Sequence, residues 1–282
     1  MGEGTIVFAG PNYDLGTEER ATLLAEAGAT REGFTGMRSR AVRGLNWGPL
    51  PGAAAEAEDI DAALGASAYG PVVRYEGDGA LEEVFKAITA PRILHVGTHG
   101  FFLEDQKLDE DERFASTGEL ESGFGAAKGL ARLRGTENPL MRSGLVFAGA
   151  NTLGAANSDA SVEDGWVTAE EIAMMDLRST ELVVLSACES GLGEVKTGDG
   201  VHGLRRAFAY AGVHALLTSL FKVPDTETRA LMQGFYDGLK AGNGKLTALR
   251  DAQLALIEAR RAANDAAHPF FWASFILIGE TG

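Results

Sequence analysis

Continuous apolar runs alternate with helical patterns along most of this 282-residue chain. A strand that is apolar at every position is typical of a parallel sheet covered on both faces, because neither side of it meets water. The alternation favours an α/β fold, a three-layer sandwich with a mostly parallel sheet flanked by helices. The predicted strands are 5–9, 71–75, 92–97, 144–149, 181–187, 213–219 and 274–279, and the predicted helices are 17–28, 53–64, 79–89, 168–175, 200–211, 225–240 and 245–264.

One stretch, 103–139, interrupts this rhythm with an acidic run followed by glycine-rich sequence. We interpret it as a long loop inserted into a single domain that spans 1–282. A charge run of this kind is typical of a solvated loop. A lid or a cleavage-sensitive loop beside a site is the alternative, because structureless loops of this length are uncommon unless they are functional or disordered.

The charge balance excludes several classes of partner. With 40 acidic and 25 basic residues, the chain carries a net charge of -15. Such a charge repels nucleic-acid phosphates and anionic membranes, so we expect neither as a direct partner. No stretch approaches the roughly 18 apolar residues of a membrane span, and the first residues lack the pattern of a signal peptide. We therefore expect a cytoplasmic protein.

A candidate nucleophile and its base each follow a predicted strand. Cys188, the only cysteine, comes just after strand 181–187, and the glycine-flanked His99 comes just after strand 92–97. Ligands bind outside the carboxyl ends of parallel strands, so both side chains can face one crevice. A thiol needs a nearby imidazole to favour the thiolate and to protonate the leaving amine. The alternative for Cys188 is a small buried hydrophobic residue.

Other motifs carry weaker signals, and we expect no metal and no cofactor. His95 and His99 have the spacing of a metal-binding helix, but on a strand they would lie about 13 Å apart, and no carboxylate completes a ligand set. We therefore assign His95 to the core. The glycine pattern at 198–203 does not directly follow a strand, as a dinucleotide-binding turn must. The segment 241–247 lacks the first glycine of a P-loop.

Five blocks in this order together resemble the CHAT family, caspase-like cysteine peptidases that are related to caspases and separase and are often fused to tetratricopeptide repeats. The likeness runs from about residue 5 to residue 280. The blocks are His95-Val-Gly-Thr-His99-Gly-Phe-Phe102, Leu185-Ser-Ala-Cys188-Glu-Ser-Gly-Leu-Gly193, the stretch from Gly198 to Gly212, Ser219-Leu-Phe-Lys-Val-Pro-Asp225 and His268-Pro-Phe-Phe-Trp-Ala-Ser-Phe275.

The resemblance implies a caspase–haemoglobinase fold and a catalytic dyad. Cys188 would attack the scissile carbonyl, and His99 would protonate the leaving amine and help to activate water for deacylation. The backbone N–H groups of Gly100 and Cys188 would form the oxyanion hole, in which the loss of one donor costs on the order of a hundredfold or more in rate. No third triad residue is expected.

Substrate recognition is less clearly specified. By resemblance to separase, Asp225 stands where an acidic side chain lines a pocket for a basic residue. Its alternative role is the N-cap of helix 225–240. Glu189 and Asp199 are further candidates for the rim of the pocket.

The same resemblance implies an endopeptidase that cleaves specific protein partners, in bacterial defence or cell death. Family members usually carry an additional segment before the strand that matches 5–9. The chain is then either a compact variant or, as we expect, a C-terminal piece of a larger protein, without that segment and without a tetratricopeptide-repeat regulatory module. A non-catalytic module that binds proteins through the same groove is the alternative function. A dinucleotide-binding enzyme is a third.

Overall fold

Six strands form the main sheet, in the order β2-β1-β3-β7-β8-β9. The first five run parallel, and β9 pairs antiparallel with β8. The strands are β1 (Thr5–Pro11), β2 (Val72–Gly77), β3 (Ile93–Gly97), β7 (Leu182–Leu185), β8 (Ala215–Ser219) and β9 (Phe275–Gly279). This computed structural model describes residues 2–27, 45–89, 91–103, 138–152, 163–186, 199–221, 225–264 and 266–282.

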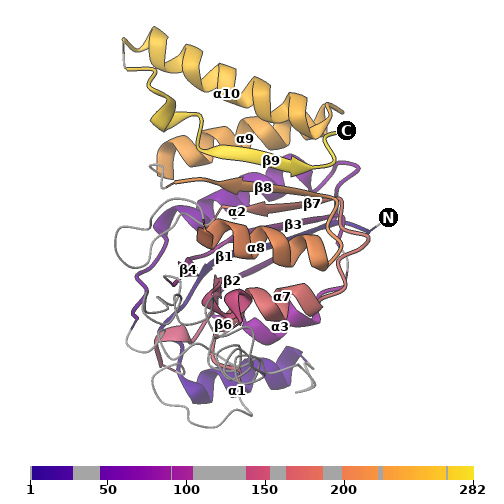
Figure 1. Cartoon of the computed structure of the whole chain (residues 1–282), viewed down its shortest axis with the longest axis vertical. Coiled ribbons are helices and arrows are strands. Elements are labelled where there is room, and N and C mark those ends of the chain that lie inside the picture. Colours follow the sequence, from indigo (N-terminus) through magenta and orange to yellow (C-terminus); the bar gives the residue numbers. More distant parts are fainter. Residues whose placement is uncertain are drawn as a thin grey trace, which may run out of the picture.

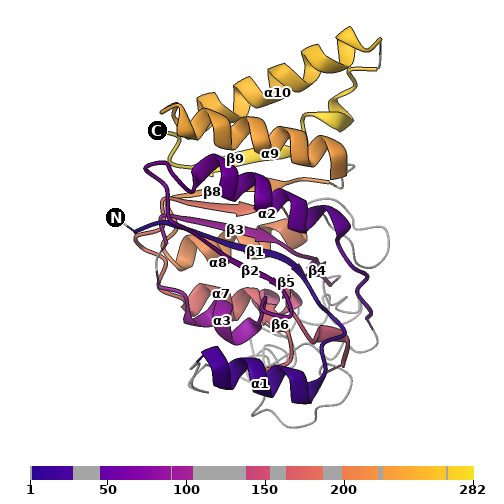
Figure 2. The same cartoon turned by 180° about the vertical axis from the view of Figure 1, so that it is seen from behind.

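Helices cover both faces of the main sheet. In Figure 1, α8 (Asp199–Tyr210), α7 (Ala169–Met174) and α3 (Glu82–Ala87) lie in front of the strands. In the reverse view, α2 (Pro51–Leu64) and α9 (Asp225–Lys240) lie in front, and α10 (Lys245–Ala262) packs on α9 beyond the β9 edge (Figure 2). Another described helix, α1 (Thr17–Ala27), lies at the opposite end of the molecule from α10.

Neighbouring residues of one strand pack into separate hydrophobic cores on opposite faces of the sheet. On β1, Val7 packs with the helices α2, α9 and α10, whereas Phe8 packs with the α3, α7 and α8 side. On β7, Val184 and Val183 divide in the same way. This double burial explains the continuous apolar runs, because side chains on both faces of the sheet are removed from water. The predicted three-layer α/β sandwich with a mostly parallel sheet is confirmed.

A second, antiparallel sheet follows the carboxyl end of β3. It has the order β4-β5-β6, formed by β4 (Gly100–Phe102), β5 (Ser143–Val146) and β6 (Trp166–Thr168). The predicted strand 144–149 exists as β5 but belongs to this sheet, and the sequence analysis missed β4 and β6. A side chain at Gly144 would collide with the Val167 carbonyl and the Phe101 ring. Glycine is therefore required where the three strands approach so closely.

The predicted helices are present, with ends shifted by a few residues, as is usual at frayed helix termini. The start of α7 is fixed by a capping box, in which Thr168 and Glu171 satisfy each other's backbone N–H groups. Two short 3-10 helices, η2 (Pro139–Arg142) and η3 (Pro269–Phe271), precede β5 and β9. Most of the predicted loop 103–139 lies outside the described residues.

Candidate active site

His99 lies two residues beyond the carboxyl end of β3, at the junction with β4. It is only 6% exposed. The rings of Tyr13 and Trp47 pack against its imidazole, with centroid separations of 5.1 and 5.3 Å. The imidazole is therefore largely shielded from water and restricted in its orientation.

A backbone carbonyl orients the His99 ring. Nε2 of His99 lies 2.7 Å from the carbonyl oxygen of Gly48. A carbonyl can only accept, so Nε2 must carry a proton and donate it. In the neutral imidazole the other nitrogen, Nδ1, is then the basic one. The sequence analysis expected no third triad residue, and the group found here belongs to the main chain, which no side-chain motif reveals.

A chain of hydrogen bonds fixes the backbone at His99. The His99 N–H donates to the Tyr13 hydroxyl at 3.3 Å, which donates to Thr98 Oγ1 at 3.0 Å, and Thr98 donates to the Val146 carbonyl. Burial raises the pKa of Tyr13 to about 12, so the phenol keeps the proton that this direction requires. In return, the Val146 N–H donates to the His99 carbonyl at 2.9 Å. No motif in the sequence predicts these roles for Tyr13 and Thr98.

The N–H of Gly100 points away from β5. In an antiparallel pair, the N–H groups of alternate residues face the partner strand. The His99 carbonyl bonds the Val146 N–H, and the Leu103 N–H bonds the Arg142 carbonyl at 2.7 Å, so the odd-numbered residues of this segment face β5. Gly100 is opposite Leu145 in the register, in the alternate position. Its N–H is thus directed to the other side of the strand.

The carboxyl end of β7 lies beside that of β3. The Ser186 N–H donates to the Val96 carbonyl at 3.0 Å, and Ser186 Oγ donates to Glu56 Oε2, from α2, at 2.9 Å. Ser186 is the last described residue before the predicted nucleophile. Cys188 and Glu189 lie outside the described residues.

Two predicted rim residues begin helices. Asp199 is the first residue of α8, and Asp225 is the first residue of α9. The Asp225 side chain is exposed and contacts the start of α2, where a Cβ added at Gly52 would lie 3.4 Å from Asp225 Oδ2. Gly52 follows Gly48 closely in sequence. Asp225 therefore lies near the segment whose carbonyl, that of Gly48, accepts the hydrogen bond from His99.

His95 is a core residue, as predicted. It is 1% exposed, and its Nδ1 lies 2.8 Å from the hydroxyl of Tyr236 on α9. Burial lowers the pKa of His95 to about 3, which keeps the imidazole neutral.

A buried acidic cluster anchors residues 163–171 to α3. Carboxylate oxygens of Glu82, Glu163 and Glu171 lie within 4.8 Å of one another. The Lys86 ammonium contacts all three, at 3.4, 2.8 and 2.9 Å respectively. Burial, with the charges of Asp164 and Glu171, raises the pKa of Glu82 well above its usual value. The lysine occupies the position that a cation would need, so we assign the cluster a structural role.

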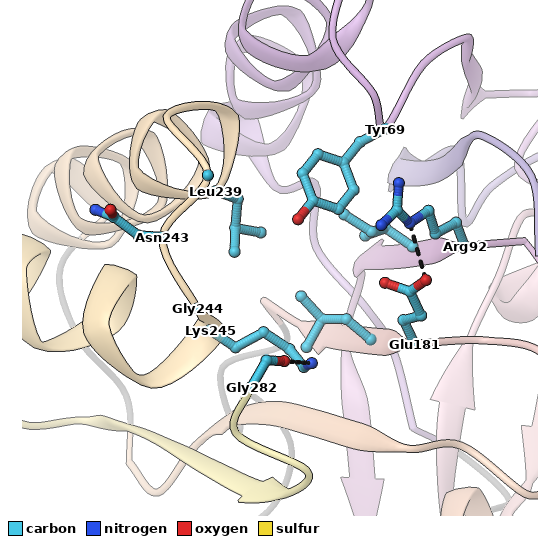
Figure 3. Close-up of a pocket in the computed structure, with 11 residues that line it drawn as sticks. Tyr69, Arg92, Glu181, Leu239, Asn243, Gly244, Lys245 and Gly282 are labelled. Atoms are coloured by element: carbon cyan, nitrogen blue, oxygen red, sulfur yellow. Dashed lines mark hydrogen bonds and ion pairs between the residues drawn. The ribbon is translucent and has the colours of Figure 1, made fainter. Parts of the chain in front are cut away.

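A cavity of about 350 Å³ opens at the amino edge of the main sheet, away from His99 (Figure 3). Arg92 donates from Nε to Glu181 at 3.0 Å and stacks over the Tyr69 ring at 4.3 Å. On the other wall, Lys245 donates to the carbonyl of Gly282. The charged groups that line this cavity have partners within the protein, which makes it a weaker candidate than the carboxyl edge.

The chain also resembles known proteins over most of its length. It is 28% identical over 236 residues to tetratricopeptide repeat protein 28 of Mus musculus, and equally to that of Homo sapiens. In both cases the match covers 83% of this chain and 9% of the relative. The chain thus spans about a tenth of the length of the curated relatives that it matches.

No helix in the described parts of the chain is long and apolar enough to cross a membrane.

The CHAT domain family model matches residues 3–280, and the predicted resemblance is confirmed. A caspase-like, peptidase-related fold agrees with the parallel sheet and its two helical layers. This chain belongs to the CHAT family.

Proposed function

We propose that this chain is a cysteine endopeptidase that cleaves protein or peptide substrates through a dyad of Cys188 and His99. Membership of the CHAT family supports a peptidase-related role. The buried, oriented imidazole at a strand end supports the assignment of His99 as the base. The same setting would suit a protein-binding groove without turnover, so the two functions are separated by the experiment below.

The strand register is the observation that carries the proposal. Ile93 pairs with Leu182, and Val96 pairs with Leu185, so each β3 residue is opposite the residue 89 positions later (182 − 93 = 89 and 185 − 96 = 89). Cys188 also follows His99 by 89 positions (188 − 99 = 89). Both positions therefore come shortly after neighbouring parallel strands, at matching places in the register, which supports our proposal that they share one edge of the sheet.

The proposed reaction uses the basic Nδ1 of His99. It takes the thiol proton of Cys188 as the sulfur attacks the scissile carbonyl, and it returns that proton to the leaving amine. Water then attacks the thioester and gives a proton to His99, which passes it to the departing sulfur, so that the acid product and the free thiol are released. The N–H of Gly100, which points away from β5, and the N–H of Cys188 are the proposed oxyanion donors.

Asp225 is the best-placed of the proposed substrate-binding residues. It is exposed and lies against the start of α2, close in sequence to the carbonyl that orients His99. Its carboxylate would favour a basic side chain in the substrate. Glu189 and Asp199 are proposed at the rim on sequence grounds alone.

The proposed regulatory partner is a tetratricopeptide-repeat module. The matched relatives are named as tetratricopeptide repeat proteins, and this chain aligns with 9% of their length. An attached or separate repeat module would control access to the groove or activate the dyad.

Cleavage of a proteome-derived peptide library tests the proposal, with every new terminus identified by mass spectrometry. We expect cuts by the wild type that are absent with Cys188→Ala and reduced at least about a hundredfold with His99→Ala, the usual contribution of a general acid–base. Binding of peptides without any cysteine-dependent cut would instead indicate a non-catalytic protein-binding module.

A further inference from the structure

The carboxyl group of Glu56 is buried in the middle of α2. Its side chain is 8% exposed and faces the sheet, because α2 packs against β1 and α9. Oε2 accepts the hydrogen bond from Ser186. Oε1 has no hydrogen-bond partner among the described residues and lies 3.6 Å from His95 Nε2.

Two side chains lie next to this carboxyl group. Burial lowers the pKa of His95 to about 3, so its ring is neutral. The Nδ1 atom of this ring lies 2.8 Å from the Tyr236 hydroxyl, and its Nε2 atom faces Glu56. Of Ser186 and His95, only Ser186 is within hydrogen-bond distance of Glu56.

The fold gains little from a carboxylate at this position. A buried charge is unfavourable unless it is fully hydrogen-bonded or paired. Among the described residues, Glu56 has one hydrogen bond, from Ser186, and no lysine or arginine forms an ion pair with it. Burial, together with the charges of Asp59 and Asp225, raises the pKa of Glu56 to about 7, although Ser186 and Arg229 act against this shift. Groups that violate local packing rules in this way are expected where function requires them.

The helix α2 and the residues just before it contact the chain at or near both halves of the proposed dyad. Gly48, three residues before the helix, holds the His99 ring through its carbonyl. Glu56, in the middle of the helix, holds Ser186, two residues before Cys188. We infer that Glu56 is a positioning residue: it fixes the carboxyl end of β7 relative to α2, and thereby sets the nucleophile segment against the histidine. This inference rests on the proposed function.

The inference gives a pH dependence. A hydrogen bond to an ionised acceptor is stronger than one to a neutral acceptor, so Ser186 is held best when Glu56 is deprotonated. The charged and titratable groups that face Glu56 are His95 from β3, Tyr236, Asp225 and Arg229 from α9, and Asp59 from α2 itself. Burial keeps His95 neutral and Tyr236 protonated, and the pKa of Glu56 is raised to about 7, so Glu56 changes charge near neutral pH.

The test uses the single cysteine of the chain. Alkylation of the full chain by iodoacetamide reports on Cys188 alone, needs no substrate and can be followed by intact mass between pH 6 and 9. Ser186→Ala removes the donor of the hydrogen bond, and Glu56→Gln replaces the charged acceptor by a neutral one. Glu58→Gln, an exposed position on the same helix, is the matched control, and His99→Ala gives the rate without the proposed base.

We expect Ser186→Ala to lower the alkylation rate at pH 7 roughly tenfold, the effect of losing one hydrogen bond, and towards the His99→Ala rate. Glu56→Gln should lower the rate in the same direction but by less, because its amide oxygen still accepts from Ser186. Glu58→Gln should match the wild type. The alkylation rate of Glu56→Gln should also depend less on pH near 7 than that of the wild type. At pH 8 this variant should resist urea at least as well as the wild type, whereas replacing a merely structural residue would lower the resistance to urea.

Three results overturn the inference. If Glu56→Gln and Ser186→Ala are both alkylated at the wild-type rate while His99→Ala is alkylated more slowly, the proposed dyad is supported but Glu56 has no role in it. A slower rate accompanied by lower urea resistance in Glu56→Gln at pH 8 would make the residue structural. A wild-type rate in His99→Ala would mean that the proposed dyad itself is wrong, and the inference would fail with it.

Discussion

The side chain of His99 donates a hydrogen bond to the backbone carbonyl of Gly48 at 2.7 Å. The two residues are 51 positions apart, and the contact links the end of β3 to the chain that leads into α2. It selects one tautomer of the imidazole and leaves Nδ1 as the base. Orientation of a catalytic imidazole by a fixed acceptor is a general requirement of nucleophile–base pairs.

Tyr13→Phe tests the support beneath this histidine. The substitution removes the hydroxyl that accepts from the His99 N–H and donates to Thr98. Because a buried polar group loses its partner, we expect a loss of about 1–3 kcal/mol in the free energy of unfolding. Urea denaturation measures it. Tyr210→Phe, at a position 70% exposed, should change nothing; equal effects of the two substitutions would show that the buried chain contributes no stability.

Lys86→Met tests the acidic cluster at α3. Without the ammonium, Glu82, Glu163 and Glu171 would be left close together and largely buried. Breaking a buried charge arrangement from one side typically costs about 3–5 kcal/mol, and we expect a loss of that size in urea denaturation. Lys240→Met, at an exposed position, is the control. A loss no greater than in the control would contradict the structural role of the cluster.

Glu56 makes the stability of the protein depend on pH. Burial raises its pKa from 4.5 to about 7, so the folded state holds this proton more tightly than the unfolded state. Its contribution to stability is fully present below pH 4.5 and is lost as the pH rises through 7. Since one pKa unit corresponds to about 1.4 kcal/mol, Glu56→Gln should be more stable than the wild type at pH 8 by up to about 3 kcal/mol. Denaturation at pH 5 and pH 8 measures the difference, and an equal effect at both pH values would refute this assignment.

Arg92→Ala tests whether the amino-edge cavity takes part in the proposed reaction. The substitution removes the ion pair with Glu181 and the stacking on Tyr69. Because Arg92 is partly exposed, we expect a loss of about 1 kcal/mol or less, with the rate of peptide cleavage unchanged. Loss of cleavage in a protein of nearly wild-type stability would place this cavity in the active site.

The main sheet could be predicted because its strands are buried on both faces, which gives runs such as Leu182–Leu185 an unmistakable pattern. The strands β4 and β6 could not, because three residues carry too little periodicity. The antiparallel pairing of β5 also has no local signal, because it depends on Gly144 meeting two distant strands.

The same distinction applies to the candidate site. His99 could be found from its place after a strand and its flanking glycine. The carbonyl of Gly48 could not, because any residue would supply the same backbone group. Glu56 has the polar appearance of a helix surface residue, and only the packing of α2 against α9 places it inside.

A double-mutant cycle on peptide cleavage tests the central claim most directly, with Cys188→Ala, His99→Ala and the double variant compared at one pH on a peptide selected from the library. Residues that act as a unit have strongly non-additive effects. If Cys188 and His99 act together, both single variants lose nearly all cleavage and the double variant is no worse than the poorer single one. Substantial cleavage in either single variant, or a double variant whose loss is the product of two independent losses, would contradict it.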